Sequence, residues 1–131
     1  MYKVLVPQAL KTVARDFLTQ KGYELVVPTG TDETALKEAI ANVDGVIART
    51  EKYTKSVVGA AKRLKVIARY GIGFENIDLA ACDAKGITVT LARGCNTYSV
   101  AEHAITLMLA CLRRIPRLNQ EIHKANWKSR D

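Results

Sequence analysis

The 131-residue sequence has only two histidines, three cysteines and one tryptophan, and no apolar run long enough to span a membrane. Its cysteines, Cys82, Cys95 and Cys111, are odd in number and widely spaced, so they predict neither a disulfide framework nor a CxxC metal site. The apolar stretch at the start is too short for a secretory signal. We therefore expect a cytoplasmic protein with no membrane association and no bound metal.

The positive charge is unevenly distributed. The net charge of +7 could indicate a nucleic-acid partner. Much of the excess lies near the C-terminus, and no basic patch is interleaved with aromatic residues. The basic residues of this region are Arg113, Arg114, Arg117, Lys124, Lys128 and Arg130. A solvated helix face explains them, so we expect no nucleic-acid partner.

Short β-branched runs alternate with helical patterns along most of the chain. Strands are predicted at residues 2–6, 23–27, 44–48, 65–69 and 86–90. Helices are predicted at residues 8–21, 32–41, 54–61 and 78–85, and Thr31 or Asp32 is the expected N-cap of the second. A further helix begins near Tyr98 and runs to Trp127, kinked or restarted at Pro116. The pattern predicts an α/β fold: a flavodoxin-like, doubly wound, mainly parallel five-stranded sheet with a long C-terminal exit helix.

A glycine-laced turn follows the fourth predicted strand. Gly71 and Gly73 allow a ligand to approach the main chain closely. Successive N–H groups in such a turn can form a concave nest for an anion such as a carboxylate. Taken alone, a short Gly-X-Gly turn is more often a plain chain reversal.

A tetrapeptide is repeated one β-α unit apart. Val46-Ile-Ala-Arg49 and Val66-Ile-Ala-Arg69 each end a predicted strand with a guanidinium group. Open parallel sheets bind ligands beyond the carboxyl ends of their strands. Arg49 is therefore either a structural salt-bridge partner or part of the binding site for an anionic substrate.

Three ordered motifs occupy the second half. Arg69–Asp78 fits Gly-x-Gly-x-x-x-(Ile/Val)-Asp, and Lys85–Val89 leads to Gly94-Cys-Asn96. The third motif, Asn96–His103, precedes Arg114-Ile-Pro116 and Trp127. In this order and spacing the sequence resembles the N-terminal, substrate-binding part of the D-isomer-specific 2-hydroxyacid dehydrogenases. The first half fits less strongly, through Asp44-Gly-Val-Ile and Arg49-Thr50.

The resemblance implies roles for individual residues. The backbone of the glycine turn would hold the carboxylate of a 2-hydroxy or 2-keto acid, and Arg49 would favour a substrate with a second anionic group. Asn96 would point its amide toward substrate. The residues assigned to substrate are thus Arg49, Tyr70, Gly71, Ile72, Gly73 and Asn96, and those near the nicotinamide cofactor are Ile72 and Val100.

The sequence also departs from what a complete dehydrogenase needs. It lacks Gly-x-Gly-x-x-Gly, because Asn76 stands where the third glycine would be. His103 and His123 are interpreted as ordinary helix residues, so we expect no catalytic residue in this chain. Residues 1–97 are predicted to form the substrate-binding domain, and residues 98–131 an inter-domain helix and hinge leading to a Rossmann domain that is not part of the sequence.

The resulting hypothesis is the substrate-binding portion of an NAD- or NADP-dependent dehydrogenase, inactive and without cofactor on its own. Its parent would be a homodimer acting on a small acid such as 3-phosphoglycerate or hydroxypyruvate/glyoxylate. The alternative is a stand-alone, non-catalytic module that binds a small acid or has a regulatory role. A phosphate-binding flavodoxin would need a Thr/Ser/Gly-rich loop after the first strand, which Pro7–Lys11 is not.

Overall fold

The computed structural model describes residues 1–127. The basic residues Lys128 and Arg130, and with them the end of the predicted second domain, lie outside this range. The chain divides into two compact units, of which the first ends at Arg93 and the second begins at Gly94. The sequence-based boundary stood at residue 97.

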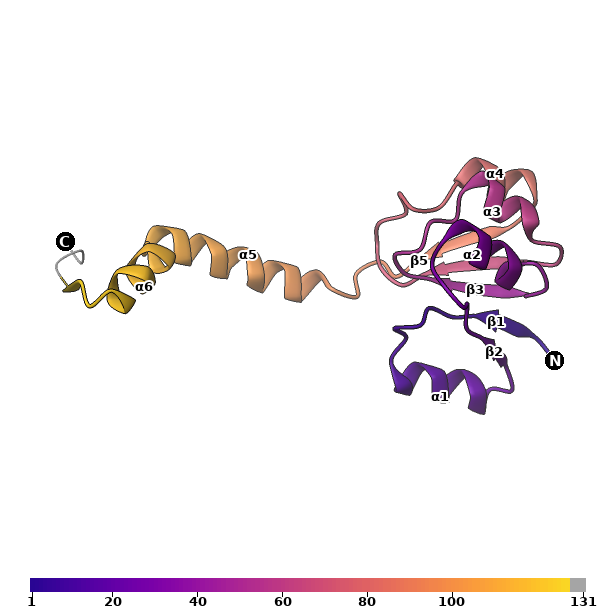
Figure 1. Cartoon of the computed structure of the whole chain (residues 1–131), viewed down its shortest axis with the longest axis horizontal. Coiled ribbons are helices and arrows are strands. Elements are labelled where there is room, and N and C mark those ends of the chain that lie inside the picture. Colours follow the sequence, from indigo (N-terminus) through magenta and orange to yellow (C-terminus); the bar gives the residue numbers. More distant parts are fainter. Residues whose placement is uncertain (128–131) are drawn as a thin grey trace. The chain divides into compact units, whose positions relative to one another are not determined.

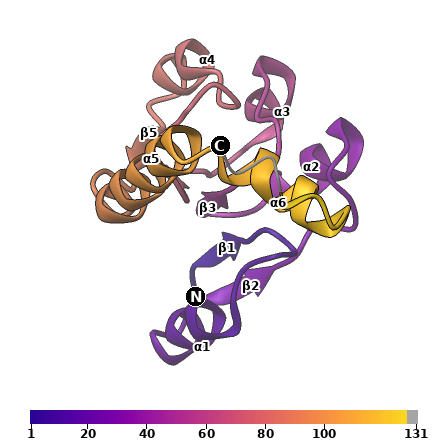
Figure 2. The same cartoon turned by 90° about the vertical axis from the view of Figure 1, so that its left-hand side faces the viewer.

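The first unit is built on a five-stranded parallel sheet in the order β2-β1-β3-β4-β5. Its strands are β1 (Lys3–Leu5), β2 (Glu24–Val26), β3 (Gly45–Ala48), β4 (Val66–Arg69) and β5 (Thr88–Leu91). Its helices are α1 (Thr12–Gln20), α2 (Glu33–Ile40), α3 (Lys55–Ala60) and α4 (Leu79–Ala84). Helix α1 lies on one face of the sheet, and α2, α3 and α4 lie on the other (Figures 1 and 2). The predicted flavodoxin-like order is confirmed.

Side chains fix where the helices begin. Asp32 accepts hydrogen bonds from the N–H groups of Thr34 (3.0 Å) and Ala35 (3.1 Å), which confirms it as the N-cap of α2. Helix α1 begins at Thr12, four residues later than predicted. The cause is Arg15, whose guanidinium donates to the carbonyls of Pro7, Gln8 and Leu10 and holds this segment in a turn.

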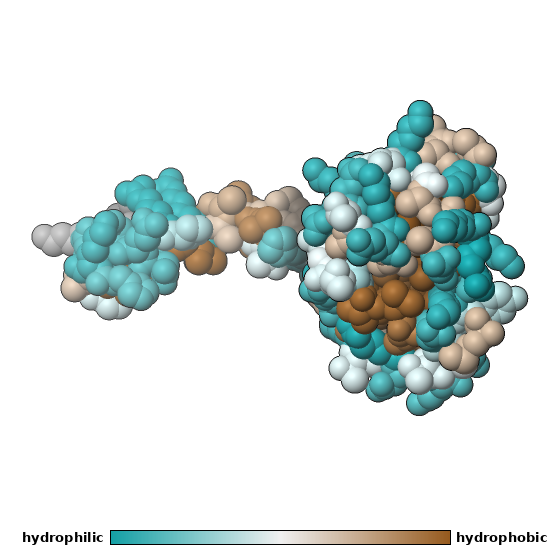
Figure 3. Space-filling view, turned by 45° about the vertical axis from the view of Figure 1, so that its right-hand side comes forward, coloured by the Kyte–Doolittle hydropathy of each residue, from teal (hydrophilic) through white to brown (hydrophobic). Residues whose placement is uncertain are grey.

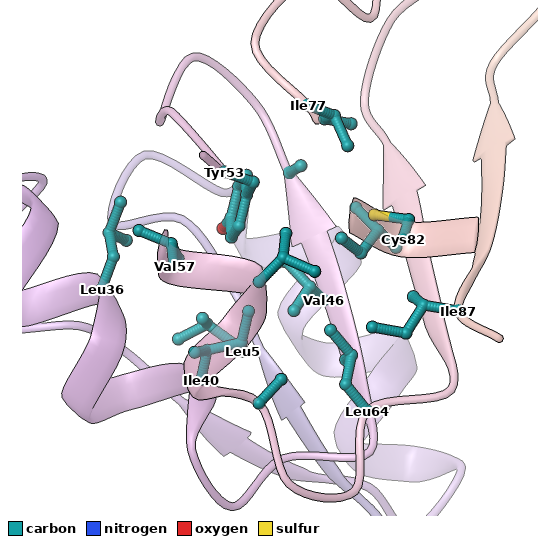
Figure 4. Close-up of a cluster of buried hydrophobic side chains, with 14 of the residues drawn as sticks. Leu5, Leu36, Ile40, Val46, Tyr53, Val57, Leu64, Ile77, Cys82 and Ile87 are labelled. Atoms are coloured by element: carbon teal, nitrogen blue, oxygen red, sulfur yellow. The ribbon is translucent and has the colours of Figure 1, made fainter. Parts of the chain in front are cut away.

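The core lies between the sheet and helices α2–α4 (Figure 4). Val46 of β3 and Ile67 of β4 pair across the sheet and are almost fully buried. Tyr53 is also buried, at 2% exposure, and burial together with the charge of Glu51 raises the pKa of its hydroxyl. The buried Cys82 thiol has a raised pKa because burial disfavours its thiolate.

Two polar clusters hold the edges of this core. Asp44 accepts from the main-chain N–H of Lys3 (2.8 Å) and from Nε and Nη2 of Arg63 (2.9 and 2.7 Å). Lys85 Nζ donates to three main-chain carbonyls at the end of α3, those of Val58 (3.3 Å), Gly59 (2.8 Å) and Ala61 (2.6 Å). The ammonium group thus satisfies carbonyls that a helix end leaves without partners.

The face of the sheet that carries α1 is partly open. A hollow of about 380 Å³ is lined there by Tyr2, Val4, Leu18, Ile47 and Val66. Apolar side chains also gather on the face of the first unit that Figure 3 shows. Parallel sheets usually have both faces covered, so this open face is unusual.

The second unit contains α5 (Thr97–Leu112) and α6 (Ile115–His123). The predicted long helix is thus divided in two, and the break is at Arg114, whose φ is +50°, two residues before the predicted restart at Pro116. A proline in the first turn of α6 suits this restart, since a missing N–H costs nothing there. The apolar side chains of α5 are about half exposed. Even so, no helix within residues 1–127 is both long and apolar enough to cross a membrane.

Candidate functional site

The carboxyl ends of β3 and β4 bring two loops together. Residues 49–54 follow β3, and residues 70–78 follow β4. The main chains of the loops form a parallel bridge, in which Tyr53 N donates to Asn76 O (2.7 Å) and Asp78 N donates to Tyr53 O (2.9 Å). Both loops lie at the edge where an open parallel sheet binds its ligand.

The turn at residues 70–73 leaves consecutive N–H groups without partners. Tyr70 N donates to Ala48 O (2.8 Å), and Gly71 N donates to Arg69 O (2.9 Å). In the described part of the chain, the N–H groups of Ile72 and Gly73 have no acceptor. Of the four predicted residues, Ile72 and Gly73 therefore offer donors to an anion, while Tyr70 and Gly71 shape the turn.

Gly71 is in a conformation that requires glycine. Its φ is +146°, and a Cβ atom there would lie 2.7 Å from Nη1 of Arg69. Its carbonyl accepts from Ala92 N (3.0 Å), which ties the turn to the segment after β5. The backbone at residue 71 is therefore held from both sides.

Arg69 is a functional candidate that the sequence placed only at a strand end. Its Nη1 donates to the carbonyl of Tyr70, and its guanidinium lies against Gly71. Its Nε is buried and has no hydrogen-bond partner within residues 1–127. A positive charge thus lies against Gly71, the residue before the unpaired N–H groups, and a guanidinium is a group that binds anions.

The repeated tetrapeptide is offset by one residue in the sheet. Val46 pairs with Ile67, and Ala48 pairs with Arg69. Arg49 consequently lies one position beyond the paired strands. The repeat therefore gave the correct sheet edge for both arginines but not equivalent positions on it.

Arg49 is exposed and has no ion-pair partner in the described chain, although its main chain is fixed. The buried carboxylate of Glu51 accepts from the N–H groups of Arg49 (2.9 Å) and Thr50 (3.0 Å). Asn76 Nδ2 donates to the carbonyls of Glu51 (2.7 Å) and Arg49 (3.4 Å). Within residues 1–127 Arg49 is therefore not a salt-bridge partner, and its role in binding an anion stays a prediction.

The surroundings of the turn are apolar and only half covered. Tyr70, Ile72 and Phe74 are 50%, 51% and 43% exposed. A larger hollow of about 580 Å³ lies nearby, but Glu75 and Asp78 are among its lining residues and none of residues 70–73 is. Lys52 also lines that hollow, and the carboxylate of Glu75 lies against Gly73 as well, so charge does not separate the two places. We place the candidate site at the turn because of its unpaired N–H groups.

The remaining predicted residues belong to the second unit. Asn96 precedes α5 and makes no side-chain capping bond, and Val100 is 56% exposed in the first turns of this helix. His103 is exposed within α5. His123 Nδ1 lies 2.8 Å from the carbonyl oxygen of Asn119, one helical turn earlier. No group of His, Cys, Asp and Glu residues within residues 1–127 could hold a metal ion.

A family model described as the catalytic domain of D-isomer specific 2-hydroxyacid dehydrogenases matches residues 4–127. The chain belongs to this family. The resemblance seen in the motifs is thereby confirmed.

Known members of the dehydrogenase family match most of the chain. D-3-phosphoglycerate dehydrogenase of Archaeoglobus fulgidus is 39% identical over 96% of this chain and 24% of its own length. Hydroxypyruvate reductase of Thermotoga maritima is 36% identical over 98% of this chain and 42% of its own length. The crystal structure of NAD+-bound 3-phosphoglycerate dehydrogenase of Entamoeba histolytica is 31% identical, with a TM-score of 0.75, over 86% of this chain and 39% of that one. The chain thus spans less than half the length of each.

Proposed function

We propose that this chain is the substrate-binding portion of a D-2-hydroxyacid dehydrogenase and that the turn at residues 70–73 binds the carboxylate of a 2-hydroxy or 2-keto acid. The parent reaction is hydride transfer between a nicotinamide cofactor and C2 of the acid. The observation that carries the proposal is the pair of unpaired N–H groups at Ile72 and Gly73, beside the guanidinium of Arg69, at the carboxyl edge of a parallel sheet.

The residues present fit one wall of a cofactor site rather than a dinucleotide cradle. A pyrophosphate needs a glycine-rich turn that opens directly into a helix. Here Asn76 replaces the third glycine, and α4 begins only at Leu79. We propose that the half-exposed Ile72, together with Val100, contacts the nicotinamide of NAD or NADP in the parent, and that this chain alone binds no cofactor.

The proposed substrate is a small acid, and Arg49 bears on which one. An exposed guanidinium without an ion-pair partner suits a second anionic group, such as the phosphate of 3-phosphoglycerate. Hydroxypyruvate or glyoxylate would use the turn alone, and Asn96 would contact either acid through its amide. A homodimeric parent, completed by a Rossmann domain and located in the cytoplasm, belongs to the same proposal.

The test is a titration of the 131-residue chain with D-lactate, followed by the amide resonances of the backbone in NMR. We expect saturable shifts at Ile72 and Gly73 and no comparable shifts at residues of α1. D-Lactamide, which has the same shape without the negative charge, is the matched control and is expected to cause none. Equal shifts with lactamide, or no saturable shift at the turn, would contradict carboxylate binding. The chain alone should also fail to oxidise NADH with hydroxypyruvate.

A further inference from the structure

We infer that Asn76 is a positioning residue that couples Arg49 to the carboxylate-binding turn, an inference that rests on the proposed function. Asn76 does not belong to the turn itself, and its side chain points back to the other loop. Its two side-chain hydrogen bonds hold the main chain at Arg49, from which the guanidinium extends, next to the loop that carries the turn.

The contacts of Asn76 run in both directions between the loops. Its Nδ2 donates to the carbonyls of Glu51 (2.7 Å) and Arg49 (3.4 Å), and its own carbonyl accepts from Tyr53 N (2.7 Å). Asparagine suits this place because a single amide supplies two N–H donors. Within the described chain, no other side chain hydrogen-bonds to both residue 49 and residue 51 from outside their loop.

Residues 49–54 are also held by contacts within their own loop. The carboxylate of Glu51 is 8% exposed and accepts from the N–H groups of Arg49 and Thr50. Tyr53, which is 2% exposed, anchors the end of the loop in the core. The main chain at Arg49 is thus held by hydrogen bonds from Glu51 within its own loop and from Asn76 of the other loop.

This arrangement makes a specific prediction about ligand preference. An acid with one carboxylate needs the turn alone, whereas an acid with a distant second anion needs the turn and Arg49 at a fixed separation. Loosening the coupling should weaken binding of 3-phosphoglycerate more than binding of D-lactate. Asn76 thus contributes to specificity without having to contact the substrate.

The experiment compares Asn76→Asp with the unaltered chain, using 3-phosphoglycerate and D-lactate as probes in NMR titrations. Aspartate keeps the shape but replaces the donating amide with a charge that repels the two carbonyls. We expect the affinity for 3-phosphoglycerate to fall by about tenfold, the usual effect of losing one well-placed charged contact, and that for D-lactate to change by less than about twofold. Asn76→Ser, which removes the donating amide without adding a charge, is measured beside it and should show the same preference. Asn42→Asp, at an exposed position of the same unit, controls for the net charge of the chain and should leave both affinities unchanged.

A double-mutant cycle then shows whether Asn76 acts through Arg49. In an Arg49→Ala background, Asn76→Asp should no longer alter the ratio of the two affinities. An undiminished effect there, or an unchanged ratio in the single variant, would overturn the inference while leaving the proposed function in place. If Asn76→Asp does not fold, Asn76→Ser, whose shorter side chain cannot reach the carbonyl of Glu51, replaces it.

The failure of the proposed function has a different signature. If the unaltered chain binds neither acid, the function proposed for the turn is wrong. The coupling is then judged without a ligand, by the amide resonances and hydrogen-exchange rates of Arg49 and Thr50. Faster exchange at both residues in Asn76→Asp supports the coupling, and unchanged exchange refutes it.

Discussion

Replacing Gly71 with alanine tests how the turn holds its shape. Alanine is strained at this backbone φ of +146°, and its Cβ would lie only 2.7 Å from Nη1 of Arg69. An unfavourable backbone conformation of this kind costs roughly 1–3 kcal/mol. Displacing Arg69 moves only the end of a flexible side chain, but it breaks the hydrogen bond to the carbonyl of Tyr70, worth about 0.5–1 kcal/mol at an exposed site. We expect the free energy of unfolding to fall by about 2–3 kcal/mol.

Two glycines provide matched controls that separate these contributions. Gly22 has a φ of +80° and open space where a Cβ would lie, so Gly22→Ala has the backbone strain alone, roughly 1–2 kcal/mol. At Gly73 a Cβ would meet only the carboxylate end of Glu75, without a positive φ. Glu75 can swing away, so Gly73→Ala should cost less than about 0.5 kcal/mol. The expected order of destabilisation is therefore Gly71, Gly22, Gly73.

The assay is urea unfolding followed by a probe inside the first unit. Tyr53, at 2% exposure, makes the near-ultraviolet circular dichroism of tyrosine suitable. Fluorescence of Trp127 is not, because this residue lies in the second unit and is 68% exposed. With a slope near 1–1.5 kcal/mol per molar urea, Gly71→Ala should lower the midpoint by about 1–3 M. Equal midpoints for Gly71→Ala and Gly73→Ala would refute the argument, since the turn would then relax without cost.

Two further predictions concern polar clusters at the rim of the core. The main-chain N–H of Lys3 and then the guanidinium of Arg63 lower the pKa of the Asp44 carboxyl in the folded chain. The ionised Asp44 therefore stabilises the fold above its unfolded-state pKa, near 3.9, and this contribution is lost as the pH falls through its lower pKa in the folded chain. Urea midpoints measured between pH 6 and pH 2 should therefore fall more for the unaltered chain than for Asp44→Asn; parallel curves would contradict this. Lys85→Met removes three hydrogen bonds to carbonyls at the end of α3 and should cost about 1–2 kcal/mol in urea unfolding, since the ammonium is partly exposed. Lys62→Met, at a neighbouring exposed lysine, is the control, and an equal loss there would mean that charge alone is responsible.

The sequence predicted the features that depend on local chemistry. Alternating β-branched and helical runs predicted five parallel strands, and the N-cap at Asp32 follows from its short acidic side chain. The start of α1 was predicted too early, because the hydrogen bonds of Arg15 to three preceding carbonyls hold this segment in a turn, which residue types alone do not show. Residue types alone led to the prediction that the glycine turn binds an anion, and this stays a prediction. Which of its N–H groups remain free was not predictable, because Tyr70 donates to Ala48, a residue of the neighbouring strand.

The role of Asn76 was hidden for the same reason. In the sequence it marks only a missing glycine, whereas its partners lie 25 and 27 residues earlier, in another loop. Residue spacing predicts neither the hydrogen bonds of Asn76 to the other loop nor the burial of Glu51. Coupling between loops of a parallel sheet depends on which strands are neighbours, and the sequence predicted this order only through the flavodoxin-like fold class.

The one-residue offset between the two Val-Ile-Ala-Arg segments has a consequence for recombining this sheet. Directly paired residues on neighbouring strands lie about 5 Å apart. A chimera in which the two segments were brought into register would place both guanidinium groups side by side at one edge, where like charges repel. In the observed register Ala48 pairs with Arg69, so the two arginines are not directly opposite each other. Two identical tetrapeptides are therefore not interchangeable parts, and exchanging their flanking loops would alter the charge pattern of the edge.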